Sequence, residues 1–243
     1  MKLSVYHTPE EVPDGAMPDC AIAIDVLRAT STMAAALDAG AAAIHVFSDL
    51  DTLRAASEQY SPETRLLAGE RGGGKVAGFD LGNSPLDHTA ALSAHRTLFM
   101  STTNGTRCLQ RIQDAPIVIT AALTTRQAVV DFLIRQGPKT VWLVGSGWEG
   151  SYSLEDTVCA GAILHRLTDQ QGSDLKDLVG NDAAIAAVSL YLQWRDRLLD
   201  LLHHATHGQR LLRLKQEADL GYCAQLDVLD IVPIQKHPGV LVR

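Results

Sequence analysis

The sequence predicts a layered α/β fold with a mainly parallel sheet. Short apolar runs of strand length alternate with amphipathic stretches of helical length along most of the chain. Several of these runs are apolar throughout, as expected for parallel strands that helices cover on both faces. No internal repeat, low-complexity tract or linker rich in Pro, Gly and Ser divides the 243 residues, so we expect a single domain, 1–243.

The predicted elements follow one another in strand–helix order from residue 20 onward. The Ala-rich helix after the first strand ends before Gly40, a common helix terminator. Ser84-Pro85 and Ser153 mark helix starts, with serine as the N-cap and, in the first case, proline at the first helical position. We expect strands at Cys20–Val26, Ile44–Phe47, Arg65–Ala68, Thr97–Met100, Ile117–Thr120, Thr140–Val144 and Ile231–Gln235. We expect helices at Ser31–Ala39, Leu50–Tyr60, Gly105–Ile112, Thr124–Gln136, Ser153–Leu167 and Asp182–Thr206. The helical segment at about 180–215 is expected to form a cap or subdomain of the single domain.

The chain is acidic, with 21 Lys and Arg, 28 Asp and Glu, and a formal net charge of −7. This balance gives no general attraction to nucleic acid or anionic membranes, so we expect neither as a partner. No apolar run approaches the roughly 18 residues of a membrane-spanning helix, and the first residues lack the apolar stretch of a signal peptide. We expect a cytoplasmic protein, and the sequence leaves a homodimer open.

The four cysteines are far apart and form no C-x-x-C pair, which argues against a zinc site and a disulfide framework. We expect each to be a small buried hydrophobic residue rather than a ligand or nucleophile. They are Cys20, Cys108, Cys159 and Cys223.

Polar residues collect directly after four predicted strands, in the loops Asp25–Thr32, Gly69–Lys75, Ser101–Thr106 and Gly145–Gly150. In such sheets ligands bind at the carboxyl ends of the strands. Any one loop is compatible with ordinary turn chemistry. The four together indicate a site, because solvent-exposed turns do not need Glu-Arg or Asp-x-x-Arg at strand ends.

Three familiar motifs are incomplete in these loops. Gly69–Lys75 fits the glycines and lysine of a P-loop, but Val76 follows where serine or threonine should hold Mg²⁺. Gly145–Gly150 fits a dinucleotide-binding string, but Glu149 would face the pyrophosphate with like charge. Asp25 resembles the nucleophile of haloacid dehalogenase-type phosphatases, yet Leu27 stands where those enzymes need a second carboxylate.

The remaining chemistry suits a phosphorylated, acidic substrate. Arg28 and Arg71 can present paired donors to phosphate or sulfonate oxygens. The helix starts at Thr30-Ser31 and Thr102–Thr106 offer free amides to an anion, and Asn104-Gly105 allows a sharp backbone turn. The carboxylates would repel that anion unless a cation intervened, and carboxylates with phosphate are the usual environment of Mg²⁺. These carboxylates are Asp25, Glu70, Glu149, Glu155 and Asp156.

We expect Asp25 and Glu70 to bind Mg²⁺, directly or through water. Two routes for phosphate release are open, direct attack by water or a phosphoenzyme. We favour water, with Glu149, Glu155 or Asp156 to orient it, and no cysteine as nucleophile. Glu155 and Asp156 are equally compatible with a structural role, because the helix dipole alone favours acids in a first turn.

Five strings carry a resemblance to a known family: Asp25–Thr32, Gly69–Arg71, Gly78–Pro85, Thr102–Thr106 and Glu155–Gly161. Together they resemble 2-phosphosulfolactate phosphatase over nearly the whole chain. The resemblance implies a three-layer α/β/α fold and Mg²⁺-dependent hydrolysis of 2-phospho-3-sulfolactate to 3-sulfolactate and phosphate. In the family's founding context this step belongs to coenzyme M biosynthesis.

The residues expected to bind the small anionic substrate come from these strings. They are Arg28, Thr30, Ser31, Arg71, Asn83, Ser84, Thr102, Thr103, Asn104, Gly105 and Thr106. Because a fold does not fix a substrate, another small phosphorylated carboxylic acid stays open as the substrate. So do a non-catalytic anion-binding protein on the same scaffold and a dinucleotide-dependent oxidoreductase that uses Gly145–Gly150.

Overall fold

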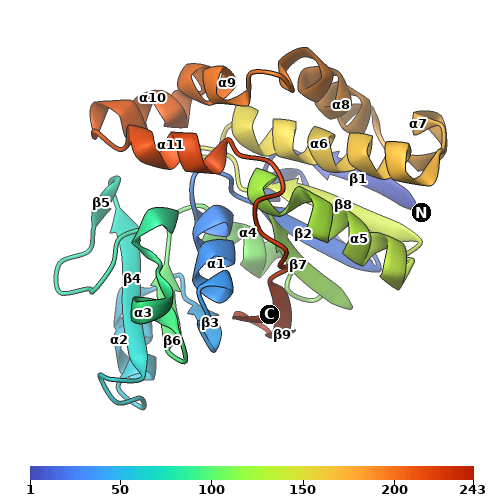
Figure 1. Cartoon of the computed structure of the whole chain (residues 1–243). Coiled ribbons are helices and arrows are strands. Elements are labelled where there is room, and N and C mark those ends of the chain that lie inside the picture. The colour runs from blue at the N-terminus through green and yellow to red at the C-terminus, as the bar shows by residue number, and fades with distance from the viewer.

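The computed structural model describes all 243 residues, with one ten-stranded sheet between helices (Figure 1). The strands are β1 (Lys2–Tyr6), β2 (Cys20–Ile24), β3 (Ala43–Val46), β4 (Arg65–Arg71), β5 (Gly74–Lys75), β6 (Thr97–Ser101), β7 (Ile117–Ala121), β8 (Thr140–Gly145), β9 (Ile234–His237) and β10 (Val240–Val242). The predicted α/β fold with a mainly parallel sheet is confirmed, and the helices on both faces give the three layers that the resemblance implies.

The helices and 3₁₀ turns follow the strands in sequence. The α-helices are α1 (Ala29–Asp38), α2 (Leu50–Ser57), α3 (Ala90–Ser93), α4 (Gly105–Ile112), α5 (Arg126–Gln136), α6 (Leu154–Gln171), α7 (Leu175–Leu178), α8 (Asp182–Trp194), α9 (Leu198–His204), α10 (Thr206–Arg213) and α11 (Glu217–Cys223). The 3₁₀ turns are η1 (Pro9–Glu11), η2 (Pro85–Asp87) and η3 (Leu123–Thr125). No helix is both long and apolar enough to cross a membrane.

The C-terminal hairpin joins two groups of parallel strands. β1, β8, β2 and β7 are parallel to one another, and so are β3, β6 and β4. Between the groups, β7 pairs antiparallel with β9, β9 with β10, and β10 with β3. The sheet is therefore mainly parallel, as predicted, with an antiparallel hairpin between its two groups, and Figure 1 shows the two groups inclined to each other.

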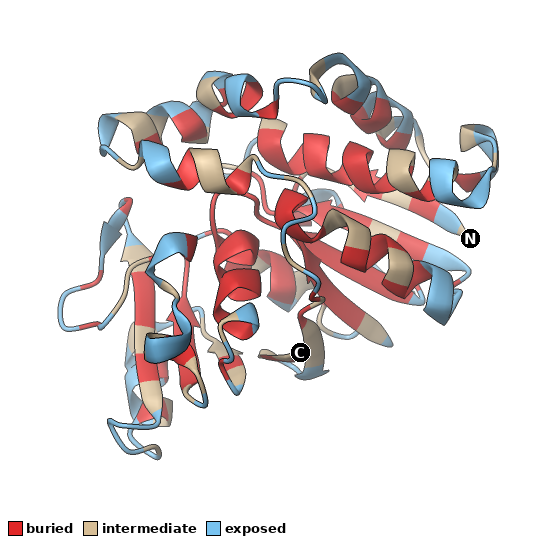
Figure 2. Cartoon of the chain, viewed as in Figure 1, coloured by how far each residue is buried: buried red, intermediate tan, exposed pale blue.

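Alternation along β2 explains how both faces of the sheet are covered. Cys20, Ile22 and Ile24 point into a core cluster with α5, α6 and α8, whereas Ala21 and Ala23 point into a second cluster with α1 and α4. All five are buried, and the short alanine side chains leave room for α4 close to β2. Figure 2 shows buried residues concentrated in the strands and on the facing sides of α1 and α6.

Most predicted elements are confirmed with small shifts of their ends. The helix Gly105–Ile112 has the predicted bounds, and Ser153 caps α6 by accepting a hydrogen bond from the Asp156 amide. β1, β5 and β10 are absent from the sequence-based prediction. β1 mixes half-buried and buried positions, so it lacks a continuous apolar run, and β5 and β10 have only 2 and 3 residues.

Three expectations need correction. The helix expected at Ser84-Pro85 is a single 3₁₀ turn, although Ser84 does cap it, because a new helix begins after Thr89. The stretch Asp182–Thr206 is broken into α8 and α9 at the charged residues 195–197. The last predicted strand is displaced to β9, which begins directly after Pro233, a residue without an amide N–H to donate.

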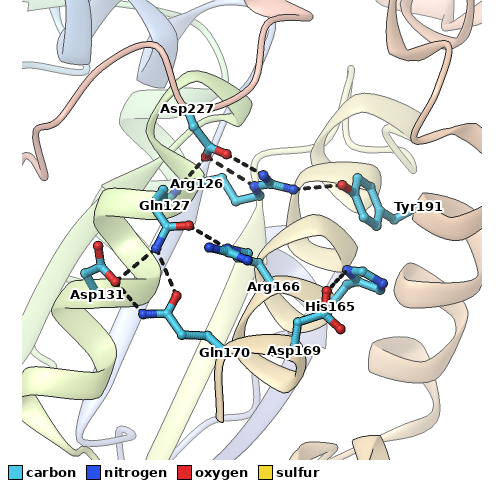
Figure 3. A network of polar contacts seen from close by, with 9 residues as sticks. All are labelled: Arg126, Gln127, Asp131, His165, Arg166, Asp169, Gln170, Tyr191 and Asp227. Carbon is cyan, nitrogen blue, oxygen red and sulfur yellow. Dashed lines mark hydrogen bonds and ion pairs between the residues drawn. The ribbon is translucent and has the colours of Figure 1, made fainter. Parts of the chain in front are cut away.

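A polar network fixes α5, α6, α8 and the chain that returns from α11 to β9 (Figure 3). The guanidinium of Arg126 pairs with Asp227 and donates to the hydroxyl of Tyr191 at 2.7 Å. Gln127 donates to Asp131 at 3.0 Å and accepts from Arg166. The network lies on the side of the fold covered by α5 and α6, and it anchors the segment that leads into the C-terminal hairpin.

The close contact between α6 and α8 generates a stability prediction. Gly161 on α6 faces α8 so closely that an added Cβ would overlap the carbonyl group of Ala187. We expect Gly161→Ala to lower the free energy of unfolding by about 1–3 kcal/mol, because backbone cannot move aside as a flexible side chain can. Urea denaturation measures this.

The matched control is Gly221→Ala on α11, where an added Cβ meets nothing within 4 Å. There we expect a gain of about 0.5–1 kcal/mol from the helix preference of alanine. Equal effects of the two substitutions would contradict the close approach of α6 and α8.

Candidate active site

The ends of β2, β4, β6 and β8 meet beneath α10 and α11. Gly105 at the start of α4 lies so close to the β2 end that an added Cβ would be 2.6 Å from Ala29 Cβ and 3.0 Å from Asp25 Oδ2. The loop after β4 reaches α10, where Arg210 Nη2 donates to the Gly72 carbonyl at 2.6 Å. The loop after β8 also reaches α10, where the rings of Trp148 and His207 stack at 3.8 Å. The four loops are thus brought together.

Asp25 itself occupies the amino end of α1. Its Oδ1 accepts a hydrogen bond from the Ala29 amide at 3.2 Å, and its own amide donates to the Thr30 hydroxyl at 3.0 Å. The Thr30 hydroxyl donates to the Ala121 carbonyl, and the Ser31 hydroxyl to the Val26 carbonyl. Both hydroxyls are buried and hold the 25–28 loop in place. Asp25 Oδ2 has no hydrogen-bond partner of its own.

Two further carboxylates enter from the start of α6. Asp156 ties two loops together, since its Oδ1 accepts from the Val26 amide at 2.9 Å and its Oδ2 from the Gly147 amide at 3.2 Å. Glu155 lies with Oε1 3.7 Å from His207 Nδ1. Both side chains are buried. Glu149, in contrast, is exposed in the loop after β8.

Burial raises the pKa values of Asp25, Glu155 and Asp156, and the charges of neighbouring acids add to the rise at Asp25 and Asp156. Burial raises the pKa of Asp25 to about 7, with Glu155 and Glu70 adding to the rise and the Ala29 amide opposing it. Burial also raises the pKa of Glu155 to about 7. The pKa of Asp156 rises through burial and the charges of Glu155 and Asp25. At neutral pH the cluster therefore resists full ionisation.

The donor set fits Mg²⁺ bound partly by the protein. No three of the His, Cys, Asp and Glu side chains converge to hold a metal ion on their own. Mg²⁺ is commonly bound by one or two carboxylates together with substrate phosphate and water. Asp25 Oδ2, free of hydrogen bonds, and the half-buried Glu70 are suitable oxygen ligands, and a cation there would relieve the repulsion within the cluster.

The predicted arginines have different surroundings. Arg28 is buried and pairs with Asp219 of α11, Nη1 to Oδ2, at 2.5 Å; the Ser84 hydroxyl donates to the other oxygen of Asp219 at 2.6 Å. Arg71 is exposed, has no carboxylate partner, and donates to Ser101 Oγ at 2.9 Å and to the Glu70 carbonyl at 2.8 Å. Arg71 is therefore an oriented cation with an unneutralised charge.

Three adjoining cavities lie around the strand ends. The central pocket, of about 100 Å³, is lined by Glu70, Gly72, Gly73, Thr103, Asn104, Trp148, Glu149 and Arg210. The outer pocket, of about 350 Å³, is lined by Ser48, Arg71, Thr102, Thr103, Thr106, Arg107 and Gln110. The third, of about 400 Å³, is lined by Arg28, Lys75, Asn83, Ser84 and seven neighbours. The central pocket shares Thr103 with the outer pocket and Gly73 with the third.

The structure adds site residues that the sequence analysis omits. His207, Arg210 and Asp219 come from α10 and α11, far along the chain from the strand-end loops. No local signal marks them, because each is one of several polar residues on a short helix. Trp148 lies inside a predicted loop, and Arg107 directly follows the Thr102–Thr106 string; adjacency to these strings is the signal that could have found them.

The expectation that the cysteines are small buried residues is confirmed, since all four are buried and unpaired. Burial raises the pKa of Cys20, Cys108 and Cys223 to about 12, and raises that of Cys159 well above its usual value. A thiolate nucleophile is correspondingly disfavoured at neutral pH.

The chain is similar to proteins of one family along almost its whole length. The family model described as 2-phosphosulpholactate phosphatase matches residues 6–238. A protein of Trichormus variabilis named "Probable 2-phosphosulfolactate phosphatase" is 62% identical over 240 residues, covering 99% of this chain and 98% of its own. Proteins with the same name from Nostoc punctiforme and Microcystis aeruginosa are 61% and 58% identical, covering 99% and 100% of this chain and 98% and 100% of their own.

The raised pKa of Asp25 predicts a pH-dependent stability. Its folded-state pKa of about 7 exceeds the ordinary 3.8, so the folded state binds the proton more tightly and loses stability as pH rises between these values. We expect Asp25→Asn, which keeps the shape and the acceptor for Ala29, to melt above the wild type at pH 8 without divalent cations. The difference should shrink toward pH 4. Calorimetric melting temperatures measure this, and a variant no more stable than the wild type at pH 8 would contradict the raised pKa.

The buried pair of Arg28 and Asp219 generates a second prediction. Asp219→Asn leaves the guanidinium buried without a counter-charge, which should lower the free energy of unfolding by about 3–5 kcal/mol. As a control, Asp51→Asn breaks the exposed pair with Arg54, with side chains 92% and 45% exposed, and should cost less than about 1 kcal/mol. Urea denaturation compares the two, and equal losses would show that the Asp219 pair does not anchor α11.

Proposed function

This chain belongs to the 2-phosphosulfolactate phosphatase family, and from that premise we propose that it hydrolyses 2-phospho-3-sulfolactate to 3-sulfolactate and phosphate with Mg²⁺ as cofactor. The observation that carries the proposal is the buried cluster of Asp25, Glu155 and Asp156, with two arginines that lack a carboxylate partner, Arg71 and Arg210, lining the pockets at the same strand ends. Such a cluster favours a divalent cation, and free arginines favour an oxyanion.

The central pocket is the proposed position of the phosphate group. Glu70 lies on one side of it, and Thr103 and Asn104 lie at the start of α4 on another. The positive end of the α4 dipole favours an anion there. Arg210 has no carboxylate partner, and its Nε is buried without a hydrogen-bond acceptor, so its guanidinium is available to phosphate oxygens.

The residues that would hold Mg²⁺ are Asp25 and Glu70. When bound, the cation neutralises phosphate charge and lowers the pKa of water. Asp156 has the positioning role, because both of its oxygens accept backbone amides and fix the loops that carry Asp25 and Glu149. Thr30 and Ser31 support the same loop from the other side.

Glu155 is the proposed proton acceptor. With a pKa near 7, its carboxylate can take a proton from the attacking water at neutral pH. The water oxygen then forms the new bond to phosphorus as the bond from phosphorus to the C2 oxygen breaks. Because the attacking and leaving oxygens lie on opposite sides of phosphorus, the C2 oxygen takes its proton from solvent and leaves as the hydroxyl of 3-sulfolactate, while Glu155 releases its proton to solvent. His207 cannot supply this proton near pH 7, because burial and the charges of Arg28 and Arg210 lower its pKa to about 3.

We further propose that α9, α10 and α11 cap the site as part of the single domain. Contacts of α10 with Gly72 and Trp148, and of α11 with Arg28, support this role. We place the reaction in the cytoplasm, because four unpaired cysteines are typical of a reducing compartment.

The activity is tested by phosphate release from 2-phospho-3-sulfolactate, with Mg²⁺ or with a chelator. We expect Mg²⁺-dependent turnover that Asp25→Asn abolishes, because one negative charge is lost at unchanged shape. Arg71→Lys should lower kcat/KM by roughly tenfold or more, since lysine keeps the charge but loses the planar fork. Unchanged activity and Mg²⁺ dependence in Asp25→Asn would contradict the assigned site.

Two further outcomes distinguish the alternatives. Faster turnover of another small phosphorylated acid would reassign the substrate, and no turnover of any phosphate ester would favour an anion-binding protein.

Acid quenching during turnover of phosphate-labelled substrate tests whether the reaction proceeds by direct hydrolysis or through a phosphoenzyme. We expect no label on the protein, and stoichiometric acid-stable label on a side chain would replace direct hydrolysis with a phosphoenzyme.

A further inference from the structure

The outer pocket has arginines but no carboxylate among the residues that line it. Arg71 and Arg107 lie there with Thr102, Thr103 and Thr106. The adjoining central pocket has the opposite character, because Glu70 and Glu149 line it with Arg210. Two adjacent pockets of different charge suit a ligand with two anionic groups, of which one binds beside a cation and the other does not.

Arg71 is held ready for an anion. Its guanidinium donates only to neutral oxygens. These are the Ser101 hydroxyl, the Glu70 carbonyl and the Ser48 carbonyl. These contacts fix its orientation without neutralising its charge. A ligand that meets it loses little conformational freedom of the arginine, which favours tight and directional binding.

Arg107, on α4, also lines the outer pocket. Only some of its hydrogen-bond donors have an acceptor within the chain. Its Nη1 is 3.1 Å from Glu10 Oε1 in a half-exposed ion pair, and its Nη2 donates to the Ser146 carbonyl at 3.3 Å. Its Nε is buried and has no acceptor. A buried donor without an acceptor is unusual in folded proteins, and water or a ligand oxygen can satisfy it.

Thr103 connects the two pockets, because it lines both. In 2-phospho-3-sulfolactate the phosphate and sulfonate are on neighbouring carbons, so the two groups must occupy adjoining positions. A sulfonate is a permanent anion with three oxygens and little affinity for Mg²⁺. Two guanidinium groups with threonine hydroxyls match it better than a carboxylate cluster does.

We infer that the outer pocket is the subsite for the sulfonate group and that Arg107 is a binding residue that selects it. The inference rests on the proposed function, since it assigns a part of the same substrate. It adds a residue outside the predicted set and separates the positions of the two oxyanions across Thr103.

The test compares kcat/KM for 2-phospho-3-sulfolactate with that for 2-phospholactate, which lacks only the sulfonate. We expect Arg107→Met to reduce the preference for the sulfonated substrate by roughly tenfold or more, as loss of a charged hydrogen bond does. Arg107→Lys should restore part of the preference, because the charge returns without the fork. An equal loss for both substrates would overturn the assignment and make Arg107 a structural residue.

Arg111→Met is the matched control. Arg111 lies one turn further along α4 and binds the same N-terminal region, Val12 carbonyl at 2.7 Å and Asp14 at 2.8 Å, but it does not line the outer pocket. We expect it to leave the substrate preference unchanged. A loss of preference equal to that in Arg107→Met would show that the effect comes from loosening α4.

A binding measurement tests the sulfonate subsite independently of the phosphatase reaction. Calorimetric titration of the wild type with 3-sulfolactate and with lactate, without Mg²⁺, requires no turnover. We expect tighter binding of 3-sulfolactate and loss of that difference in Arg107→Met. Equal binding of the two acids to the wild type would overturn the subsite even if the phosphatase reaction is observed. Selective binding without any turnover would instead support the subsite and reject the proposed function.

Discussion

The arrangement of this site depends on repulsion among carboxylates that the fold buries together. Asp25 directly follows β2, and Glu155 and Asp156 lie in the first turn of α6; all three are almost inaccessible to solvent. Backbone amides compensate part of the cost at Asp25 and Asp156, but burial still raises the pKa of Asp25 and Glu155 to about 7. A fold that keeps such a cluster sacrifices stability in the absence of a counter-charge, which is typical of sites built to bind a cation or move a proton.

The topology explains how these acids come to face distant arginines. Because the C-terminal hairpin lies between β7 and β3, the last part of the chain joins the two parallel groups of strands. The preceding helices then pass over the strand ends, where α10 supplies Arg210 and His207 and α11 supplies Asp219. The segment that completes the sheet thus follows in sequence the helices that cover the site.

The sequence was sufficient for most of the longer elements and for the loops that carry the site, because both depend on local patterns. The apolar runs of β2 and β8, the serine cap of α6 and the glycine at the start of α4 are visible in a few neighbouring residues. The antiparallel hairpin and the ion pair of Arg28 with Asp219 are not visible in local sequence, because they join residues far apart in the chain. The hydroxyls of Thr30 and Ser31, which look available for a ligand in the sequence, are hydrogen-bonded to carbonyls of their own fold, and only the packed structure reveals this.

We propose that a divalent cation completes the carboxylate cluster. The most direct measurement is calorimetric titration of the protein with Mg²⁺ at pH 7, repeated in two buffers that differ in ionisation enthalpy. A cation beside carboxylates with pKa values near 7 lowers those values and releases protons. We expect Mg²⁺ binding with net proton release in the wild type, and weaker binding in Asp25→Asn. Mg²⁺ binding without proton release, or no binding at all, would contradict the claim.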